Sequence, residues 1–237
     1  MRKGILIGIA FFLGFAIYQA PAGLLRIALD DQAVITLTDL EGTLWRGRAR
    51  VVAQGNELAG LHWDLNSGAL LTAHLNYQLE IKGTDLGLQG ELDMGPGTAA
   101  LQLTGRLGSA EINRRLAPYD IALEGDFDIR EARLRLRGNR PVAADGEIHW
   151  AGGPVRYVLS GRASSSMLPP LTAYLGPGPE AVVFPADGQT PLLTARLLEN
   201  GYAKVGVTKF FTRMLGSPWP GGDPDHAVVL EVEEQLF

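Results

Sequence analysis

Four histidines are the side chains of this sequence best suited to metal binding or proton transfer. They are His62, His74, His149 and His226, and none lies within four residues of another. Zinc ligands usually come in closely spaced pairs, and no HExxH motif is present. A site shared by His62 and His149 would require two distant segments to converge. We therefore predict structural roles for these histidines and no metal site.

The remaining candidates for chemistry are equally isolated. Ser164–Ser166 lack the G-x-S-x-G context of a nucleophile elbow, and no glycine-rich phosphate loop is present. Asp223 and Asp225, near His226, sit in a Pro-Gly loop that is typical of a solvated turn. The chain has no cysteine, which excludes disulfides, thiolate zinc sites and cysteine nucleophiles. We expect no catalytic residues, no cofactor and no enzymatic activity.

Composition narrows the class of protein further. Hydrophobic residues make up 46% and charged residues 20% of the 237 positions, so the chain can form a core. Its 30 glycines and 14 prolines are spread without a period, which indicates many short strands joined by turns. A net charge of −5 argues against binding to nucleic acid.

The first 25 residues predict a membrane anchor. Arg2 and Lys3 precede a charge-free run from Gly4 to Leu25. These 22 residues would span about 33 Å as a helix, enough for a bilayer core of about 30 Å. The basic flank places the N-terminus in the cytoplasm, so residues 26–237 would lie across the inner membrane as a periplasmic domain.

A cleaved signal peptide is the alternative interpretation of the same segment. Ala20-Pro21-Ala22 has the small-x-small pattern of a cleavage site. The charge-free run is longer than an ordinary signal-peptide core, which favours an uncleaved, single-pass anchor.

Beyond the anchor, alternating polar and apolar residues predict strands. The pattern runs through residues 34–39, 70–81, 86–92, 101–107 and 129–137. One apolar and one polar face is typical of an antiparallel sheet with a single solvated face. We expect a short helix over 109–117, with Ser109 as N-cap. This segment and residues 208–215 are among the few that could cover the apolar sheet face. A last strand over 227–233 would form an edge protected by its glutamates.

An internal repeat extends this prediction. Leu40-Glu41-Gly42 recurs 83 residues later as Leu123-Glu124-Gly125, and His62-Trp63 recurs as His149-Trp150 after a four-residue insertion. Such self-similarity usually marks a duplicated structural unit. We therefore predict a mainly β fold: a long, curved antiparallel sheet built from two halves, about 26–107 and 118–200.

Tryptophans and glycines single out one region of the first half. Gly42 and Gly47 are expected to bracket a strand that carries Thr43 and Trp45 on one face. We predict that Trp45, Trp63 and Trp150 pack in the core; alternatively they line a groove for a partner or an acyl chain. The residues singled out are Gly42, Thr43, Leu44, Trp45, Gly47, Leu61, Trp63, Leu65 and Trp150.

A second candidate surface is a row of arginines. Arg133, Arg135 and Arg137 alternate with leucines, so they share the solvated face of one predicted strand. Most such rows are simply solvated, but this one could meet an acidic partner.

The motif in the first half resembles a known family. Gly42-Thr43-Leu44-Trp45-x-Gly47-x-Ala49, followed by Leu61-x-Trp63-x-Leu65 and Gly68-Ala69-Leu70-Leu71, is similar to the signature region of type II secretion system protein N, also called general secretion pathway protein N. The resemblance implies one membrane helix, a periplasmic β-rich domain and a non-catalytic accessory role in exporting folded proteins. The implied partners are other subunits of that machine.

Two functions remain open at this point. The first is an anchored scaffold that binds other secretion subunits by a sheet edge or its anchor helix. The second is a lipid-handling protein, because the repeated β organisation resembles AsmA-like and lipopolysaccharide-bridge proteins. A scaffold should cover its apolar sheet face, whereas a lipid groove must leave that face open.

Overall fold

The computed structural model describes seven stretches of the chain. They cover residues 18–25, 35–53, 55–68, 74–138, 140–159, 161–198 and 202–235. Most of the predicted anchor, residues 4–17, lies outside them; the described end of that segment includes a 3-10 turn, η1 (Ala22–Leu24). Within the seven stretches, no helix is both long enough and apolar enough to cross a membrane.

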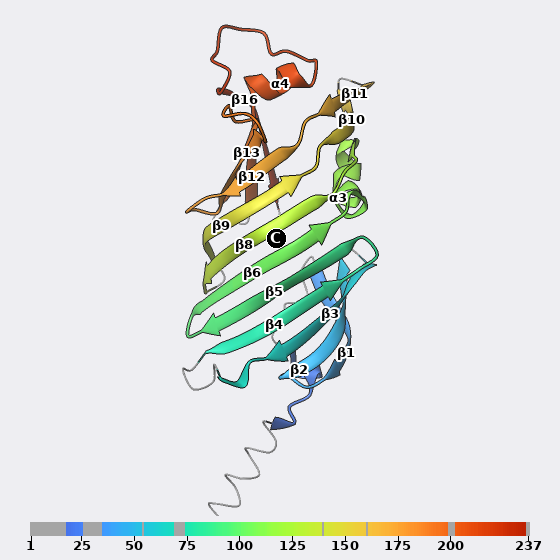
Figure 1. Cartoon of the computed structure of the whole chain (residues 1–237), viewed down its shortest axis with the longest axis vertical. Coiled ribbons are helices and arrows are strands. Elements are labelled where there is room, and N and C mark those ends of the chain that lie inside the picture. The colour runs from blue at the N-terminus through green and yellow to red at the C-terminus, as the bar shows by residue number, and fades with distance from the viewer. Residues whose placement is uncertain are drawn as a thin grey trace, which may run out of the picture.

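A single antiparallel sheet of thirteen strands dominates the fold (Figure 1). In pairing order the strands are β1 (Ile35–Gly42), β2 (Arg46–Ala53), β3 (Asn56–Leu65), β4 (Leu75–Lys82), β5 (Leu86–Gly95), β6 (Thr98–Leu107), β8 (Phe127–Arg137), β9 (Arg140–Trp150), β12 (Leu171–Leu175), β13 (Glu180–Pro185), β14 (Leu193–Leu197), β15 (Tyr202–Thr208) and β16 (Val228–Gln235). Each strand pairs with the next one in this order, so β1 and β16 are the two edges.

Smaller elements sit at one end of this sheet. A three-stranded antiparallel sheet has the order β11 (Arg162–Leu168), β10 (Gly153–Leu159) and β7 (Ile121–Leu123). Three short helices accompany it: α3 (Ser109–Leu116), η3 (Ala117–Tyr119) and α4 (Lys209–Met214).

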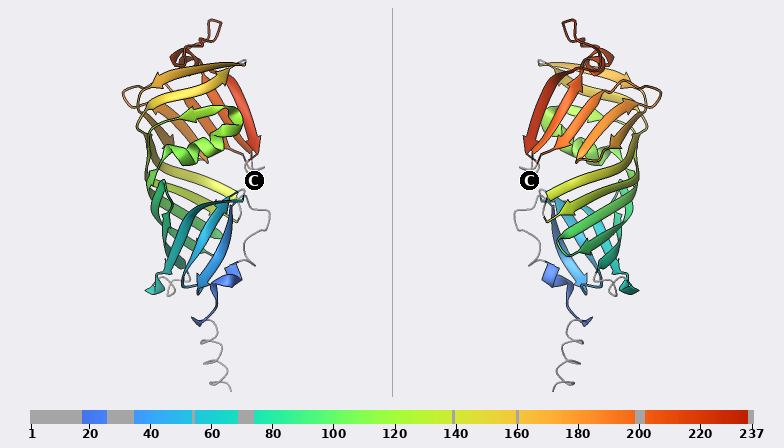
Figure 2. Two further views of the ribbon diagram at one scale, coloured as in Figure 1. Left: turned by 90° about the vertical axis from the view of Figure 1, so that its right-hand side faces the viewer. Right: turned by 90° about the vertical axis from the view of Figure 1, so that its left-hand side faces the viewer.

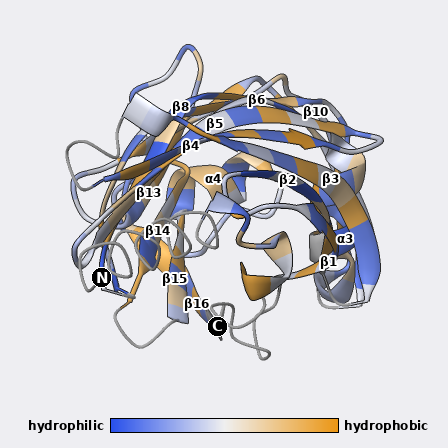
Figure 3. Ribbon diagram, turned by 90° about the horizontal axis from the view of Figure 1, so that it is seen from below, coloured by the Kyte–Doolittle hydropathy of each residue, from blue (hydrophilic) through white to orange (hydrophobic). Residues whose placement is uncertain are grey.

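The large sheet is strongly curved. Seen from below, its strands form an arch that is open on one side (Figure 3), and side views show α3 and the late strands around the upper half of the arch (Figure 2). The prediction of a mainly β protein with a curved antiparallel sheet is therefore confirmed.

Local sequence patterns anticipated most of these elements. Strands β4, β5, β6, β8 and β16 fall on predicted alternating segments, α3 falls on the predicted helix, and α4 falls in the second segment named as a possible cover of the apolar face. The expected N-cap of α3 was wrong by one residue, because Gly108 occupies that position. The Asp85 carboxylate, from the β4–β5 side of the sheet, accepts a hydrogen bond from the Ala110 amide at 3.2 Å instead.

Candidate functional site

The two faces of the large sheet differ sharply in chemistry. Apolar residues pair across neighbouring strands to form continuous rows, for example Leu92 with Leu101, and Leu101 with Leu134. We call this the inner face, because η1, the small sheet and α4 pack on it. The opposite, outer face carries the polar residues of the same strands.

The motif region forms a tight turn where a strand was expected. Strand β1 ends at Gly42 and β2 begins at Arg46, so Thr43, Leu44 and Trp45 connect them. The Thr43 amide donates to the Arg46 carbonyl at 2.9 Å, and the Thr43 hydroxyl accepts from the amides of Trp45 and Arg46 at 3.3 and 3.2 Å. Gly42 has φ +90°, a left-handed value that favours glycine. The prediction of one strand bracketed by two glycines was therefore wrong.

This turn also holds the segment that precedes the sheet. Thr43 forms an isolated antiparallel bridge with Pro21, and the Leu44 amide donates to the Ala20 carbonyl at 2.9 Å. Trp45 is only half-buried, so the prediction that it packs in the core holds in part. Its carbonyl accepts a 2.6 Å hydrogen bond from the Leu65 amide, which ties the turn to the end of β3.

Trp63 forms the centre of the first hydrophobic cluster. It is 5% exposed and contacts Ala22 of η1 and Ala49 of β2, which are also buried. Its indole N–H donates to the Thr43 carbonyl at 3.2 Å, so a buried polar group is satisfied. Leu61, Leu37, Leu40, Leu25, Tyr77 and Leu79 pack around this cluster. Burial raises the pKa of Tyr77 above its usual value.

Gly47 is explained by its cross-strand neighbour. It lies directly opposite Trp63 in the pairing of β2 with β3. A Cβ atom here would overlap the indole ring and would lie 2.5 Å from the Glu41 carbonyl oxygen. Only glycine therefore leaves room for the ring to lie flat across β2.

Trp150 has a similar arrangement in the second half of the chain. It is 5% exposed, and its indole N–H donates to the Glu124 carbonyl at 2.8 Å. Gly125, which follows that carbonyl, has φ +92°, close to the value at Gly42. Trp150 stacks on Phe127, with ring centroids 6.2 Å apart. The prediction that Trp63 and Trp150 are buried in the core is thus confirmed.

An apolar cavity of about 330 Å³ lies next to Trp150. Its floor is the inner face of β8, β9, β12, β13 and β14, and its cover is the small sheet with Phe211 and Leu215 at and after α4. The lining side chains are Ile121, Leu123, Phe127, Ile148, Trp150, Val155, Tyr157, Leu168, Leu171, Ala173, Val183, Leu193, Phe211 and Leu215.

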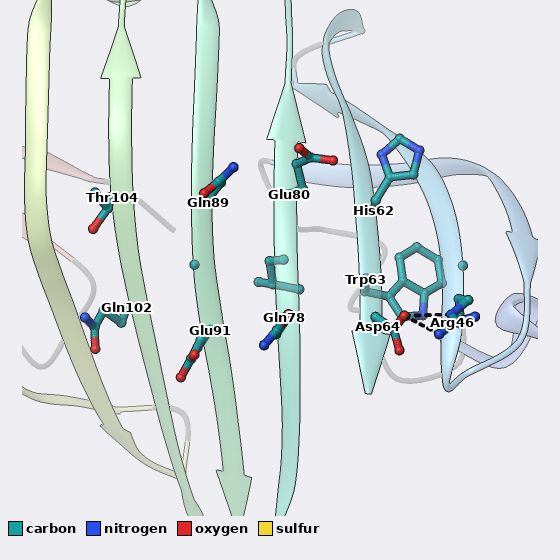
Figure 4. A pocket seen from close by; sticks show the side chains of 13 residues that line it. Arg46, His62, Trp63, Asp64, Gln78, Glu80, Gln89, Glu91, Gln102 and Thr104 are labelled. Carbon is teal, nitrogen blue, oxygen red and sulfur yellow. Dashed lines mark hydrogen bonds and ion pairs between the residues drawn. The ribbon is translucent and has the colours of Figure 1, made fainter. Parts of the chain in front are cut away.

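The outer face presents ordered rows of polar side chains (Figure 4). One row crosses seven strands in strict register: Arg46, Asp64, Gln78, Glu91, Gln102, Arg133 and Asp145. Part of this row lines an open depression of about 730 Å³. The Arg46–Asp64 ion pair spans 2.6 Å, but both side chains are largely exposed, so its contribution to stability is small.

The predicted arginine row lies on this face, with two of its members already paired. Arg133 donates to the Gln102 side-chain oxygen at 2.5 Å and lies 3.6 Å from Asp145. Arg135 contacts the same Asp145 carboxylate at 3.3 Å. Arg137 is exposed and lies opposite Arg140 and Thr98. One carboxylate thus partly neutralises the row.

The histidines and serines lie apart in the fold. His74 contacts Asp93 at 3.0 Å, and His149 bridges Glu147 and Thr172 at 2.8 and 3.0 Å. Among the described residues, no three His, Cys, Asp or Glu side chains are grouped to hold a metal ion. Ser164–Ser166 belong to β11, where the Ser166 hydroxyl donates to the Leu215 carbonyl at 3.2 Å.

Sequence reasoning named residues 208–215 as a possible cover of the apolar face, and α4 within them packs on the second cluster, but it did not single out Thr208. Thr208 is fully buried; its hydroxyl donates towards the Pro191 and Leu192 carbonyls at 2.8 and 3.0 Å and accepts from the Phe211 amide. This hydroxyl caps α4 and anchors it to the loop that precedes β14. The Thr-to-helix boundary was a usable signal for the cap, but nothing local indicated which strands α4 packs against.

Fold and site together define a mainly β protein whose open, curved antiparallel sheet has an apolar inner and a polar outer face. The family model for type II secretion system protein N matches residues 33–201, well over half of the chain. The chain belongs to the type II secretion system protein N family.

Two curated relatives agree with this assignment. The "Type II secretion system protein N" of Vibrio cholerae serotype O1 is 25% identical over 160 residues, covering 64% of each chain. The protein of the same name from Klebsiella pneumoniae is 29% identical over 160 residues, covering 63% of this chain and 60% of the relative. The matched region thus spans less than two thirds of these relatives. No solved structure matches the chain significantly.

Proposed function

We propose that this chain is an inner-membrane-anchored accessory component of the type II secretion machinery. In this role it acts in export of folded proteins across the outer membrane by binding other subunits, without enzymatic activity. Membership of the protein N family is the observation that carries the proposal. The charge-free run over residues 4–25, with Arg2 and Lys3 before it, supports a cytoplasmic N-terminus and a periplasmic domain from residue 26.

The sheet edge at β16, which pairs with no further strand among the described residues, is the surface that we propose for a partner subunit. Val228, Leu230 and Val232 are 41%, 48% and 45% exposed, although they belong to a strand. An edge of this kind can accept a strand from another chain through backbone hydrogen bonds. Glu231 and Glu233 alternate with these residues, and Lys204 approaches Glu231 at 2.8 Å. The edge therefore favours a partner strand that alternates apolar and basic side chains.

We also propose that the two halves of the sheet arose by duplication. Trp63 and Trp150 occupy matching positions in the sequence repeat, and each donates its indole N–H to a backbone carbonyl next to a left-handed glycine. Strand pairing of β6 with β8 joins the halves edge to edge. Duplication would account for the thirteen strands of this sheet, which a second layer covers only in part.

Export of a secreted enzyme tests the main proposal. Deleting the gene should retain that enzyme in the periplasm, and the wild-type chain should restore export. Leu230→Lys with Val232→Lys should fail to restore it, because two charges on an edge strand block addition of another strand. Val142→Lys is the matched control, since Val142 is 43% exposed on β9. Unchanged export in the deletion strain would refute the proposed role.

The anchor needs its own test. We expect the membrane fraction to contain a chain that begins at Met1, identified by mass spectrometry of its N-terminal peptide. A soluble chain that begins near Gly23 would instead support the signal-peptide interpretation. This result would revise the location without bearing on the export assay.

A further inference from the structure

The cavity beside Trp150 is the feature of the described chain that neither the family nor the export role explains. We propose that it is a binding site for one acyl chain of a membrane phospholipid. The proposal rests on the geometry of the cavity and does not depend on the secretion role.

The first argument is the chemistry of the lining. Thirteen of the fourteen lining side chains are hydrocarbon or aromatic without a hydroxyl, and the exception is Tyr157. Its hydroxyl donates to the Leu215 carbonyl at 2.5 Å, and the indole N–H of Trp150 donates to Glu124. Among the described residues, no buried side-chain nitrogen or oxygen lacks a partner. The cavity therefore offers an entering ligand little to hydrogen-bond.

This chemistry selects among possible occupants. A peptide strand, a sugar or a nucleotide would leave its polar groups unpaired in the cavity, and burying an unpaired polar group is unfavourable. The cavity has a volume of about 330 Å³. A single hydrocarbon chain needs no hydrogen bonds and is narrow enough to enter.

The second argument is continuity with the open part of the arch. The floor of the cavity continues across paired strands into further apolar residues, from Ile148 to Ile129 and from Phe127 to Leu107. Beyond them, Leu103, Leu101 and Leu92 extend the row towards β5. These leucines are half-buried beside their strand neighbours. A chain seated in the cavity can thus leave along an apolar path, with its polar headgroup outside.

The inner face is consistent with such a ligand because it is covered only in part. The first cluster packs η1 on β1 to β4, and the second packs the small sheet and α4 on β8, β9 and β12. A scaffold is expected to cover its apolar sheet face, whereas a lipid-binding protein must leave part of that face open. The structure has two covered regions with a half-exposed apolar stretch between them.

Site-specific photocrosslinking of the full chain in its native membrane tests the site. p-Benzoylphenylalanine is placed at Leu215, which lines the cavity, or at exposed Val142 on β9 as the control. Cells are fed an alkyne-tagged fatty acid, which they incorporate into phospholipid. We expect at least a tenfold higher yield of an adduct with the mass of a diacyl phospholipid at position 215 than at position 142.

A variant that fills the cavity distinguishes lipid bound in the cavity from lipid that only contacts the protein surface in the membrane. Ala173 lies on the cavity floor, opposite Ile148 and Val183, so Ala173→Phe should reduce the lipid adduct about tenfold. Ala195→Phe is the matched control, because Ala195 belongs to the same sheet on β14 but does not line the cavity. Protease resistance of each variant in membranes shows whether it folds.

Several outcomes would overturn the inference. These are equal lipid yields at positions 215 and 142, a peptide adduct in place of a lipid, or an unchanged yield in folded Ala173→Phe. An adduct with the mass of a free fatty acid would also overturn the commitment to phospholipid. Since export is not the readout, none of these results bears on the proposed secretion role.

Discussion

Replacing Gly47 by alanine tests the packing on which the first hydrophobic cluster depends. The new Cβ would overlap the Trp63 ring and lie 2.5 Å from the Glu41 carbonyl oxygen, so the ring must move. Overpacking of this kind costs about 1–3 kcal/mol. Displacing the ring also breaks its hydrogen bond to Thr43, worth about 1 kcal/mol. We expect Gly47→Ala to lower the free energy of unfolding by about 2–4 kcal/mol.

Gly87 provides the matched control for this change. It also lies in a strand of the large sheet, but a Cβ there would meet no atom within 4 Å. Gly87→Ala should leave stability unchanged or raise it by up to about 1 kcal/mol. Pulse proteolysis of the full chain in a urea series measures both variants in membranes. If the free energy of unfolding falls by about 3 kcal/mol for each 1 M of urea, the urea concentration at the unfolding midpoint should be about 1 M lower for Gly47→Ala than for the wild type.

A double-mutant cycle identifies the cause of the loss. In a Trp63→Leu background, Gly47→Ala should cost less than in the wild type, because the ring that it meets is gone. The residual cost comes from the Glu41 carbonyl, which stays in place. Equal midpoints for Gly47→Ala and Gly87→Ala, or a cost unaffected by Trp63→Leu, would refute this account of the motif.

Three further changes address other parts of the fold. Trp150→Phe removes the indole donor and should lower the free energy of unfolding by about 1–3 kcal/mol. The exposed Trp219→Phe should lower it by less than about 0.5 kcal/mol in the same urea series. Thr208→Ala should cost about 1–3 kcal/mol, while Thr208→Ser keeps the capping hydroxyl and most of the stability. Arg213 holds the pKa of the Asp225 carboxyl below its usual 3.8, so their contact persists above that value and is lost as the pH falls through the lowered pKa. The protection factors of the amides in residues 217–226, which correct for the intrinsic pH dependence of hydrogen exchange, should therefore fall at that acidic pH, and Asp225→Asn should produce the same fall at pH 7.

Local patterns in the sequence determined much of the architecture. Alternation of apolar and polar residues located β4, β5, β6 and β8, because side chains of a strand point to opposite faces with a period of two. The same rule predicted the apolar face and the solvated arginines. Buried positions for Trp63 and Trp150 followed from the large apolar area of the side chain.

Features that join distant segments could not be predicted in this way. The sequence indicated that Gly47 is unusual, but not that the Trp63 ring lies across it from the facing strand. It indicated that residues 208–215 could cover the apolar face, but not that Phe211 and Leu215 close a cavity against β9 and β12. Periodicity reports which face a side chain takes, whereas the choice of partner depends on strand register and sheet curvature. Those are set by pairing over the whole sheet, so only the tertiary structure decided where the apolar face is covered and where it stays open.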